Sequence, residues 1–388
     1  MIQKRDIGYI IRRWGADYSA KHNPPAVVRR AFSHMAQCRT AALGGHVDLC
    51  SECGQLFISY NSCRDRHCPK CQNKERLQWT EDRKEEIIPG MKYFHVVFTV
   101  PACLNTVAMH NQAVFYSCMF KAAWSTLKSF FGNKHLTGGM TALLHTWGSA
   151  LSYHPHLHCI VPGGGIYKKG RWHSLDSCSG KSDFLFPVQA LSNVFRARFV
   201  NMLSSALKKE GRFIPEDIRK KAFQKAWVVY SRPPAKGVNQ VVEYIARYAF
   251  RAAITNSRII NVTDDGKVTF DYKDYRHGGM HKSKTVKAVD FLMLLAQHIL
   301  PQGFFRIRHY GILSPSCRDK LREVQSQMGG TPVPRIRSKK PWLQICSEHG
   351  WKVGICPDCG CQTVTIAAIN PSRAPPTLHN GSSPNKVS

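Results

Sequence analysis

The segment SYHPHLHCIVPGGG, residues 152–165, constrains the fold of this chain more than any other. Its three histidines, His154, His156 and His158, occupy alternate positions, and an apolar run and three glycines follow. Side chains two residues apart in a β-strand point to the same face, about 7 Å apart. The spacing therefore predicts a strand that carries imidazoles along one face.

A pair of imidazoles on one face of a strand can hold a metal ion. His156 and His158 can bind one ion between them, whereas all three histidines would span about 13 Å. A third ligand should therefore come from a neighbouring strand, and the segment LLHTW favours His145. His95, in KYFHVVFTVP, and His154 at a bulge are alternatives. The competing interpretation is a set of hydrogen-bonded sheet histidines without metal.

The segments around this strand alternate between strand-like and helix-like patterns. Residues 92–101 predict a buried strand ended by proline, and residues 141–165 predict two strands joined by a turn near Gly148. Residues 187–211 have helical apolar spacing with a glycine at the end, and residues 238–254 predict a second helix. We therefore expect an α+β fold in which helices back one face of a sheet.

The predicted second helix contains two tyrosines and two arginines at helical spacing. Tyr244 and Tyr248 are four residues apart, so their hydroxyls emerge on one face, with Arg247 and Arg251 on an adjacent face. A tyrosine hydroxyl can attack a phosphodiester and form a covalent phosphotyrosine. A nearby divalent metal would polarise the phosphate as a Lewis acid. The simpler interpretation is a pair of core tyrosines with basic neighbours.

The cysteines form two clusters. The chain has 15 cysteines, six of them between Cys38 and Cys71 and four between Cys346 and Cys361. Without a secretion signal, clustered CxxC pairs indicate zinc ligands in a reducing compartment. Four protein ligands leave no open position on zinc, so both predicted sites are structural.

The spacing within each cluster predicts a ligand set. In the first, the two CxxC pairs predict a site formed by Cys50, Cys53, Cys68 and Cys71. Nearby Cys38, His46, Cys63 and His67 could form a second site or replace one of these ligands. In the later cluster, the pattern C-x2-H-x6-C-x2-C predicts a knuckle formed by Cys346, His349, Cys356 and Cys359, with Cys361 as a spare or a substitute.

The charge of the chain points to a polyanionic partner. Among 388 residues, 55 Lys and Arg stand against 25 Asp and Glu, a net charge of +30. Such a surplus repels itself unless a polyanion neutralises it, which favours nucleic acid over a membrane surface. No apolar run reaches the roughly 18 residues of a membrane span. The basic segments 306–310 and 337–341 could follow phosphates.

Taken together, these motifs resemble one known family, the two-tyrosine HUH transposases of rolling-circle insertion sequences. The resemblance covers nearly the whole chain. It rests on CRTAALGGHVDLCSECG, NSCRDRHCPKCQ, YFHVVFTVP, LLHTWGSALSYHPHLHCIVPGGG, EYIARYAFRAAITNSRI and LPQGFFRIRHYGILS. It implies a ferredoxin-like or RRM-like catalytic core with an antiparallel sheet. The family's HUH pair falls on His156 and His158, and its paired nucleophiles fall on Tyr244 and Tyr248.

The resemblance also implies an activity. One tyrosine would nick a strand at an element end and hold the 5′-phosphate, and the second would cleave the second site before the ends are rejoined. Single-stranded and hairpin DNA at the element ends and target DNA would be the partners. The host replication machinery would join them if the freed 3′-OH primes replication. The catalytic metal would be Mg²⁺ or Mn²⁺, and the structural metal Zn²⁺. The resemblance also implies a protein of the bacterial cytoplasm that associates with DNA.

The predicted organisation has four parts. Residues 1–90 form a zinc-binding DNA-recognition domain, 91–285 the catalytic domain, 286–362 a helical region with a zinc knuckle, and 363–388 a disordered tail. Two other functions compete with transposition. One is a plasmid replication initiator or conjugative relaxase of the HUH class, and the other is a non-catalytic zinc protein that binds nucleic acid.

Overall fold

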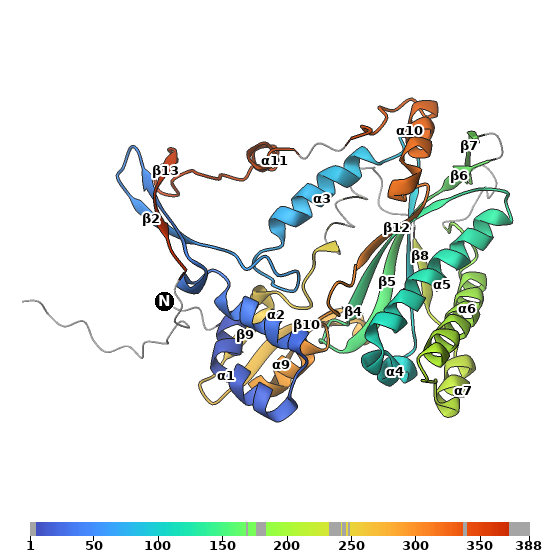
Figure 1. Ribbon diagram of the computed structural model, residues 1–388, viewed down its shortest axis with the longest axis horizontal. Coiled ribbons are helices and arrows are strands. Elements are labelled where there is room, and N and C mark those ends of the chain that lie inside the picture. The colour runs from blue at the N-terminus through green and yellow to red at the C-terminus, as the bar shows by residue number, and fades with distance from the viewer. Residues whose placement is uncertain are drawn as a thin grey trace, which may run out of the picture.

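The computed structural model describes residues 5–167, 170–175, 184–232, 242, 246, 249–336 and 340–371. Its centre is a five-stranded antiparallel sheet with the strand order β12-β4-β5-β3-β8 (Figure 1). The strands are β3 (Tyr93–Thr99), β4 (Gly139–Trp147), β5 (Tyr153–Pro162), β8 (Val229–Arg232) and β12 (Ile307–Gly311). The strands predicted over residues 92–101 and 141–165 are confirmed.

Helices cover one face of this sheet. They are α4 (Asn105–His110), α5 (Gln112–Gly132), α6 (Val188–Lys209) and α7 (Glu216–Gln224). The core beneath them includes Phe98, Phe115 and Phe195, each with no exposed side-chain surface. Leu157 and Cys159 on β5 also point into this core. Since strand side chains alternate, the histidines of β5 point to the opposite face. The expected α+β arrangement is confirmed.

A second core joins the beginning of the chain to a segment near residue 290. Helices α1 (Ile7–His22) and α2 (Ala26–Gln37) pack with α9 (Ala288–Ala296) and with the antiparallel sheet β9 (Ile259–Val262), β10 (Lys267–Asp274) and β11 (Met280–Lys287). Ile10, Met35, Phe270 and Phe291 are buried there. This sheet lies beside the β4–β5 turn, because the Ser149 Oγ atom accepts a hydrogen bond of 2.7 Å from the backbone N–H of Lys273.

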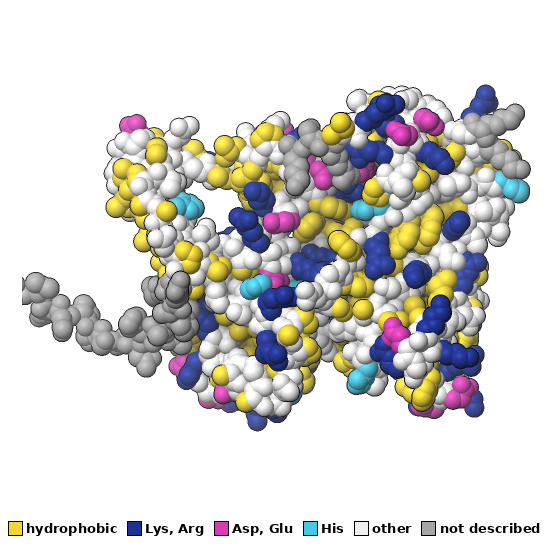
Figure 2. Space-filling view, in the orientation of Figure 1, with side chains coloured by type: hydrophobic (Ala, Val, Ile, Leu, Met, Phe, Trp, Pro, Cys, Tyr) yellow, Lys and Arg dark blue, Asp and Glu magenta, His cyan; other side chains and the backbone are white. Residues whose placement is uncertain are grey.

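A third sheet joins a hairpin in the N-terminal part of the chain to the last described strand. Strand β1 (Gly45–Cys50) pairs with β2 (Leu56–Tyr60) on one side and with β13 (Thr363–Ile369) on the other. The prediction of disorder from residue 363 is therefore wrong for β13, because its β-branched and apolar residues find a partner strand more than 300 positions away. Leu56, Ile58 and Val364 of this sheet are exposed. Figure 2 shows hydrophobic side chains at the surface of this part of the molecule.

The remaining elements complete the edges of the molecule. Helix α3 (Asn73–Glu85) contacts the short helix α11 (Trp342–Glu348), and α10 (Arg318–Gln327) supplies Leu321 and Val324 to a third apolar cluster with Leu143 and Ile160. Strands β6 (Gly164–Ile166) and β7 (Trp172–Ser174) form a hairpin. Among the described residues no helix combines the length and the apolar composition needed to cross a membrane.

Candidate metal and DNA site

The pairing of β4 with β5 brings three histidines together. His145 lies directly opposite His156, and His158 lies opposite Leu143 on the same face. One ligand nitrogen from each of His145, His156 and His158 lies within 4.8 Å of the others. The structure thus places the predicted third residue, His145, beside the predicted pair. His154 lies outside this group, with its ring centroid 5.2 Å from that of His156.

Hydrogen bonds fix the orientation of two of these imidazoles. The Nδ1 atom of His156 lies 2.7 Å from the carbonyl oxygen of His154, so Nδ1–H donates and Nε2 is the nitrogen left with a lone pair. The Nδ1 atom of His158 lies 2.9 Å from Nε2 of His95. When Nδ1–H of His158 donates to Nε2 of His95, the lone pair of Nε2 of His158 is available to bind a metal. Such outer hydrogen bonds orient metal-binding histidines.

Burial keeps the imidazoles of His156 and His158 neutral. The pKa of His156 is lowered to about 4, mainly by burial and also by the neighbouring imidazoles of His154 and His95, against the hydrogen bond to the His154 carbonyl. Burial likewise holds the pKa of His158 well below its ordinary value, reinforced by His145 and His156. A neutral imidazole is the form that binds metal. Three nitrogen ligands suit several divalent metals and leave coordination positions for water or a phosphate oxygen.

The histidines open into a pocket of about 480 Å³. Its walls come from β4, from β5, from the non-helical residues at the end of the predicted tyrosine helix and from the β9–β11 sheet with its preceding turn. The lining residues outside the histidine strand include Trp147, Ser149, Arg251, Arg258, Asp271, Lys273, Tyr275 and His281. Arg251, Arg258 and Lys273 make the lining basic, while the carboxylate of Asp271 lies 3.0 Å from Nδ1 of His281. A basic pocket next to a metal-binding cluster suits a phosphodiester.

The predicted nucleophiles lie outside the described residues. This applies to Tyr244 and Tyr248 and to Arg247. Of the helix predicted over residues 238–254, Val242, Ala246 and Ala249 are helical and buried. Residues 250–254 are described and are not helical, so the prediction is wrong for this end of the helix. Ala249 belongs to the apolar cluster that contains Leu143 and Ile160, which lie on the two histidine-bearing strands. Arg251 lines the histidine pocket.

The first cysteine site differs from the predicted one. Cys38, Cys63, Cys68 and Cys71 place their sulfur atoms within 4.8 Å of one another. Hydrogen bonds from the thiols of Cys63, Cys68 and Cys71 lower the pKa of Cys38, as expected at a site that binds metal through thiolates. The predicted grouping with Cys50 and Cys53 is wrong, because the β1–β2 hairpin carries that pair away from Cys68 and Cys71.

The second cysteine site joins distant parts of the chain. Cys50, Cys53, Cys356 and Cys359 form a second group with sulfur atoms within 4.8 Å. Backbone N–H groups of Cys53 and Glu52 lower the pKa of Cys50 to about 7. The pairing of β13 with β1 explains the grouping, since it brings the CxxC pair before β13 next to the one after β1.

Two predicted ligands of the later cluster lie outside this second group. The Nε2 atom of His349 lies 3.3 Å from a carboxylate oxygen of Glu81. Cys346 is buried, and burial raises the pKa of its thiol. The prediction that Cys346 and His349 share a metal with Cys356 and Cys359 is therefore corrected.

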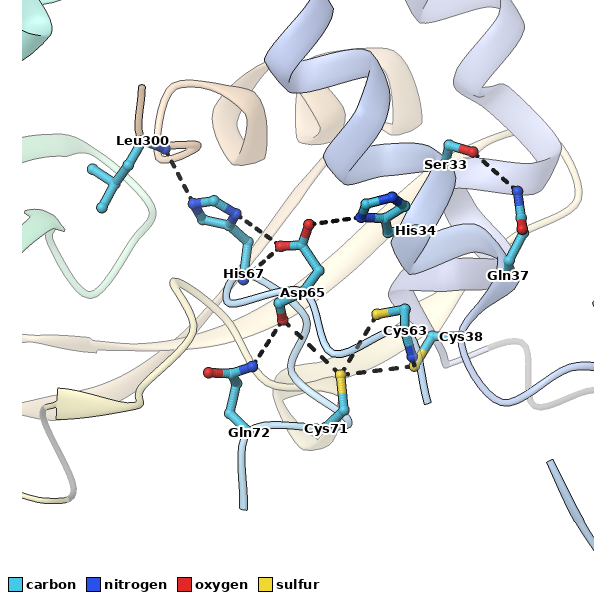
Figure 3. A network of polar contacts seen from close by, with 10 residues as sticks. All are labelled: Ser33, His34, Gln37, Cys38, Cys63, Asp65, His67, Cys71, Gln72 and Leu300. Atoms are coloured by element: carbon cyan, nitrogen blue, oxygen red, sulfur yellow. Dashed lines mark hydrogen bonds and ion pairs between the residues drawn. The ribbon is translucent and has the colours of Figure 1, made fainter. Parts of the chain in front are cut away.

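Two histidines near the first cluster are not ligands either. His67 uses both ring nitrogens, because Nδ1 lies 2.9 Å from a carboxylate oxygen of Asp65 and Nε2 accepts from the backbone N–H of Leu300 at 3.1 Å (Figure 3). His46 faces Asp48 at 3.3 Å. Burial raises the pKa of Asp65, but hydrogen bonds from His67 and His34 outweigh burial and lower it. This network ties the first cysteine site to the loop before β12.

Comparisons with known proteins identify the family. Residues 139–320, which include the three histidines, match the family described as "Putative transposase", and residues 10–100 match the family described as "Transposase zinc-binding domain". A protein named "Putative transposase y4qJ" from Sinorhizobium fredii is 39% identical over 393 residues, covering 96% of this chain and 97% of the relative. The chain belongs to this transposase family. The transposase for insertion sequence element IS801 from Pseudomonas savastanoi pv. phaseolicola is 26% identical to this transposase, over 87% of this chain and 82% of the relative.

The family assignment connects the basic pocket with DNA binding and the cysteine sites with a zinc-binding domain. A transposase acts on DNA, so this transposase binds DNA. Its zinc-binding domain matches residues 10–100, which contain all of the first cysteine group and half of the second. The other half of the second group, Cys356 and Cys359, lies beyond that match.

Sequence reasoning missed part of the transposase's pocket. Arg258, Lys273 and Tyr275 come from the β9–β11 sheet and its preceding turn, far from the histidines in sequence. No spacing motif links them to residues 152–165. Their cationic and aromatic character is the signal that could have marked them.

Proposed function

We propose that this transposase nicks and rejoins single-stranded DNA at the ends of its element through 5′-phosphotyrosine intermediates. The observation that supports this most is the group of three imidazoles on one sheet face, inside a basic pocket. A phosphodiester is the substrate that both features suit. We further propose that the sheet is the core of an HUH nuclease, with His145, His156 and His158 as the metal ligands.

In the proposed nicking step, the hydroxyl oxygen of Tyr244 or Tyr248 attacks the scissile phosphorus. The bond between phosphorus and the 3′ oxygen breaks, the phenolic proton is lost, and the leaving 3′ oxygen gains a proton. The 5′-phosphate stays bound to the tyrosine. In the rejoining step, a 3′-OH attacks the phosphotyrosine and releases the phenol, so no external energy source is needed.

The residues of the pocket have separate tasks in this proposal. Bound Mg²⁺ or Mn²⁺ would supply Lewis-acid polarisation of the phosphate. His95 and the His154 carbonyl hold His158 and His156 in their orientations. Arg251 binds the DNA backbone near the scissile phosphate, and Arg247 is proposed to do the same. Two nucleophiles allow two covalent ends to be held at one site.

The cysteine sites serve recognition in this proposal. The zinc-binding module would bind the element ends, as single-stranded or hairpin DNA, and position them against the catalytic pocket. Such a module could read base edges or grip a hairpin by its backbone. Target DNA would enter the same pocket for strand transfer.

The test separates cleavage from binding. His156→Ala and His158→Ala should reduce cleavage of labelled single-stranded oligonucleotides from the element ends by at least 100-fold, while binding to the same oligonucleotides is retained. His110→Ala, an exposed histidine on α4, is the matched control and should cleave normally. Cleavage at the normal rate by both pocket variants would refute the metal assignment. If the unchanged protein does not bind these oligonucleotides, the substrate assignment is refuted.

A further inference from the structure

Tyr275 occupies an unusual position at the edge of the histidine pocket. It begins the turn between β10 and β11 and lines the pocket together with the histidines. Its side chain is 76% exposed. A large aromatic ring left in water beside a basic pocket is a candidate surface for base stacking, since every nucleobase offers a π face.

The turn that carries Tyr275 is held by its own hydrogen bonds. Asp274 accepts from Lys282 Nζ at 2.8 Å, its carboxylate lies 2.8 Å from Nδ1 of His277, and its carbonyl accepts from the N–H of Gly279 at 2.9 Å. Gly279 has φ +78°, which a residue with a side chain rarely adopts. The position of the Tyr275 backbone is therefore defined by the turn.

The sheet that carries this turn is anchored to the histidine strands. The side chain of Ser149, in the β4–β5 turn, accepts from the N–H of Lys273 at 2.7 Å. Arg258 donates from Nε to the carbonyl of Asp271 at 2.9 Å and from Nη2 to the carbonyl of Ser149. These contacts hold the tyrosine turn at a set place relative to the metal-binding face.

The charges around the tyrosine suit a sugar-phosphate backbone. Arg251, Arg258 and Lys273 line the same pocket, and its carboxylate, Asp271, faces His281. A strand whose phosphate reaches the histidines would pass these cations, and its neighbouring base would reach the exposed ring. Cationic groups that track the backbone and an aromatic that stacks a base are the two components of single-strand recognition.

We infer that Tyr275 is the stacking platform for the nucleotide next to the scissile phosphate, with Lys273 and Arg258 binding the flanking phosphates. The inference rests on the proposed function, because it names a subsite of the same pocket. The ligand class is an unpaired nucleotide of single-stranded DNA. The hydroxyl of Tyr275 takes no part in the chemistry, so Phe should replace Tyr without loss.

The test couples a protein change to the removal of one base. Full-length Tyr244→Phe/Tyr248→Phe protein, which makes no covalent bond, is titrated with fluorescein-labelled single-stranded oligonucleotides carrying the element end. A parallel set carries an abasic site at each position around the nick in turn. Adding Tyr275→Ala should raise Kd roughly 5- to 150-fold, Tyr275→Phe should change it less than about twofold, and the exposed Tyr167→Ala control should leave it unchanged.

The decisive result is the coupling. In the protein that keeps Tyr275, an abasic site at one position should raise Kd by the same factor as Tyr275→Ala does on the intact oligonucleotide. On that abasic oligonucleotide, Tyr275→Ala should cause no further increase in Kd. The inference would be overturned if Tyr275→Ala raised Kd equally on every oligonucleotide or raised it on none. It would also be overturned if Tyr275→Phe, in the protein that keeps Tyr244 and Tyr248, abolished adduct formation. If the protein that keeps Tyr244 and Tyr248 forms a covalent adduct with DNA but Tyr275 and the abasic position are not coupled, only the stacking subsite is rejected. If they are coupled but no adduct forms, the subsite is supported and the proposed chemistry is rejected.

Discussion

The Sγ atoms of Cys50 and Cys359 lie 3.4 Å apart although 309 positions separate these residues in the chain. The contact joins the last residue of β1 to the segment before β13, and the two strands pair with each other. The zinc-binding module of this transposase is therefore completed by the C-terminal part of the described chain. A metal at this site would hold both parts together.

The two cysteine groups predict two zinc ions per chain. Replacing Cys356 and Cys359 together by Ser should lower the zinc content from about two to about one, because it removes half of the second ligand set. Elemental analysis of the purified protein measures this directly. The Cys361→Ser variant is the control and should keep both ions. A full zinc content in the double variant, or loss of one zinc on changing only Cys346, would contradict the ligand sets.

The Asp65 network predicts that a residue outside the metal ligands stabilises the first zinc module. Asp65→Ala removes the acceptor of two hydrogen bonds from His67 and the partner of His34. The expected loss is about 3 kcal/mol in the free energy of unfolding, because charged acceptors form strong hydrogen bonds and the two donors of His67 would be left buried without an acceptor. Urea unfolding compares this variant with Asp17→Ala, an exposed carboxylate on α1. Equal stability of the two variants would show that the network is dispensable.

The hydrogen bond between His95 and His158 predicts an indirect effect on metal affinity. Loss of an outer partner of a metal-binding histidine typically weakens metal binding by about 10- to 100-fold. Calorimetric titration with Mn²⁺ should show that the His95→Ala variant has lost Mn²⁺ affinity by a factor in this range. Its binding of oligonucleotides without added Mn²⁺ should be unchanged. Unaltered Mn²⁺ affinity would mean that His158 needs no orienting partner.

The lowered pKa of the buried His298 predicts that the stability of the protein depends on pH. Burial lowers its pKa from 6.5 to about 4, against a hydrogen bond to the carbonyl of Leu151. Between these pH values the unfolded chain binds a proton that the native protein does not, so stability falls as pH falls. The contribution of His298 to this loss is about 2 kcal/mol between pH 7 and pH 5. His298→Gln should lose less stability than the unchanged protein over this interval in urea unfolding. Parallel pH profiles would rule out this contribution.

Local patterns were enough to predict the elements around the site. The alternation of His154, His156 and His158 defined a strand face, and the apolar spacing of residues 187–211 defined α6. Each pattern depends only on neighbours in sequence, which share one strand or one helix. The grouping of the three site histidines also followed from a local feature, the short turn between β4 and β5.

Long-range pairing set the limits of prediction. The CxxC motifs identified ligands, but which pairs meet depends on the pairing of β1 with β13 and on the separation of the β1–β2 hairpin from Cys68 and Cys71. Tyr275 was missed for a related reason, since only the packing of β10 against the β4–β5 turn brings it to the histidines. Sequence spacing contains neither relationship.

Covalent capture of DNA tests the central claim most directly. Oligonucleotides from the element ends, labelled at the 5′ or the 3′ end, are incubated with the protein and Mg²⁺ or Mn²⁺ and analysed on a denaturing gel. The unchanged protein should form an adduct with the fragment that carries the 5′-phosphate, and mass spectrometry should locate it on Tyr244 or Tyr248. Each single Phe variant should lose one of the two cleavages, and the double variant should form no adduct. An adduct that persists in the double variant, or DNA that is bound but never joined to the protein, would contradict the account.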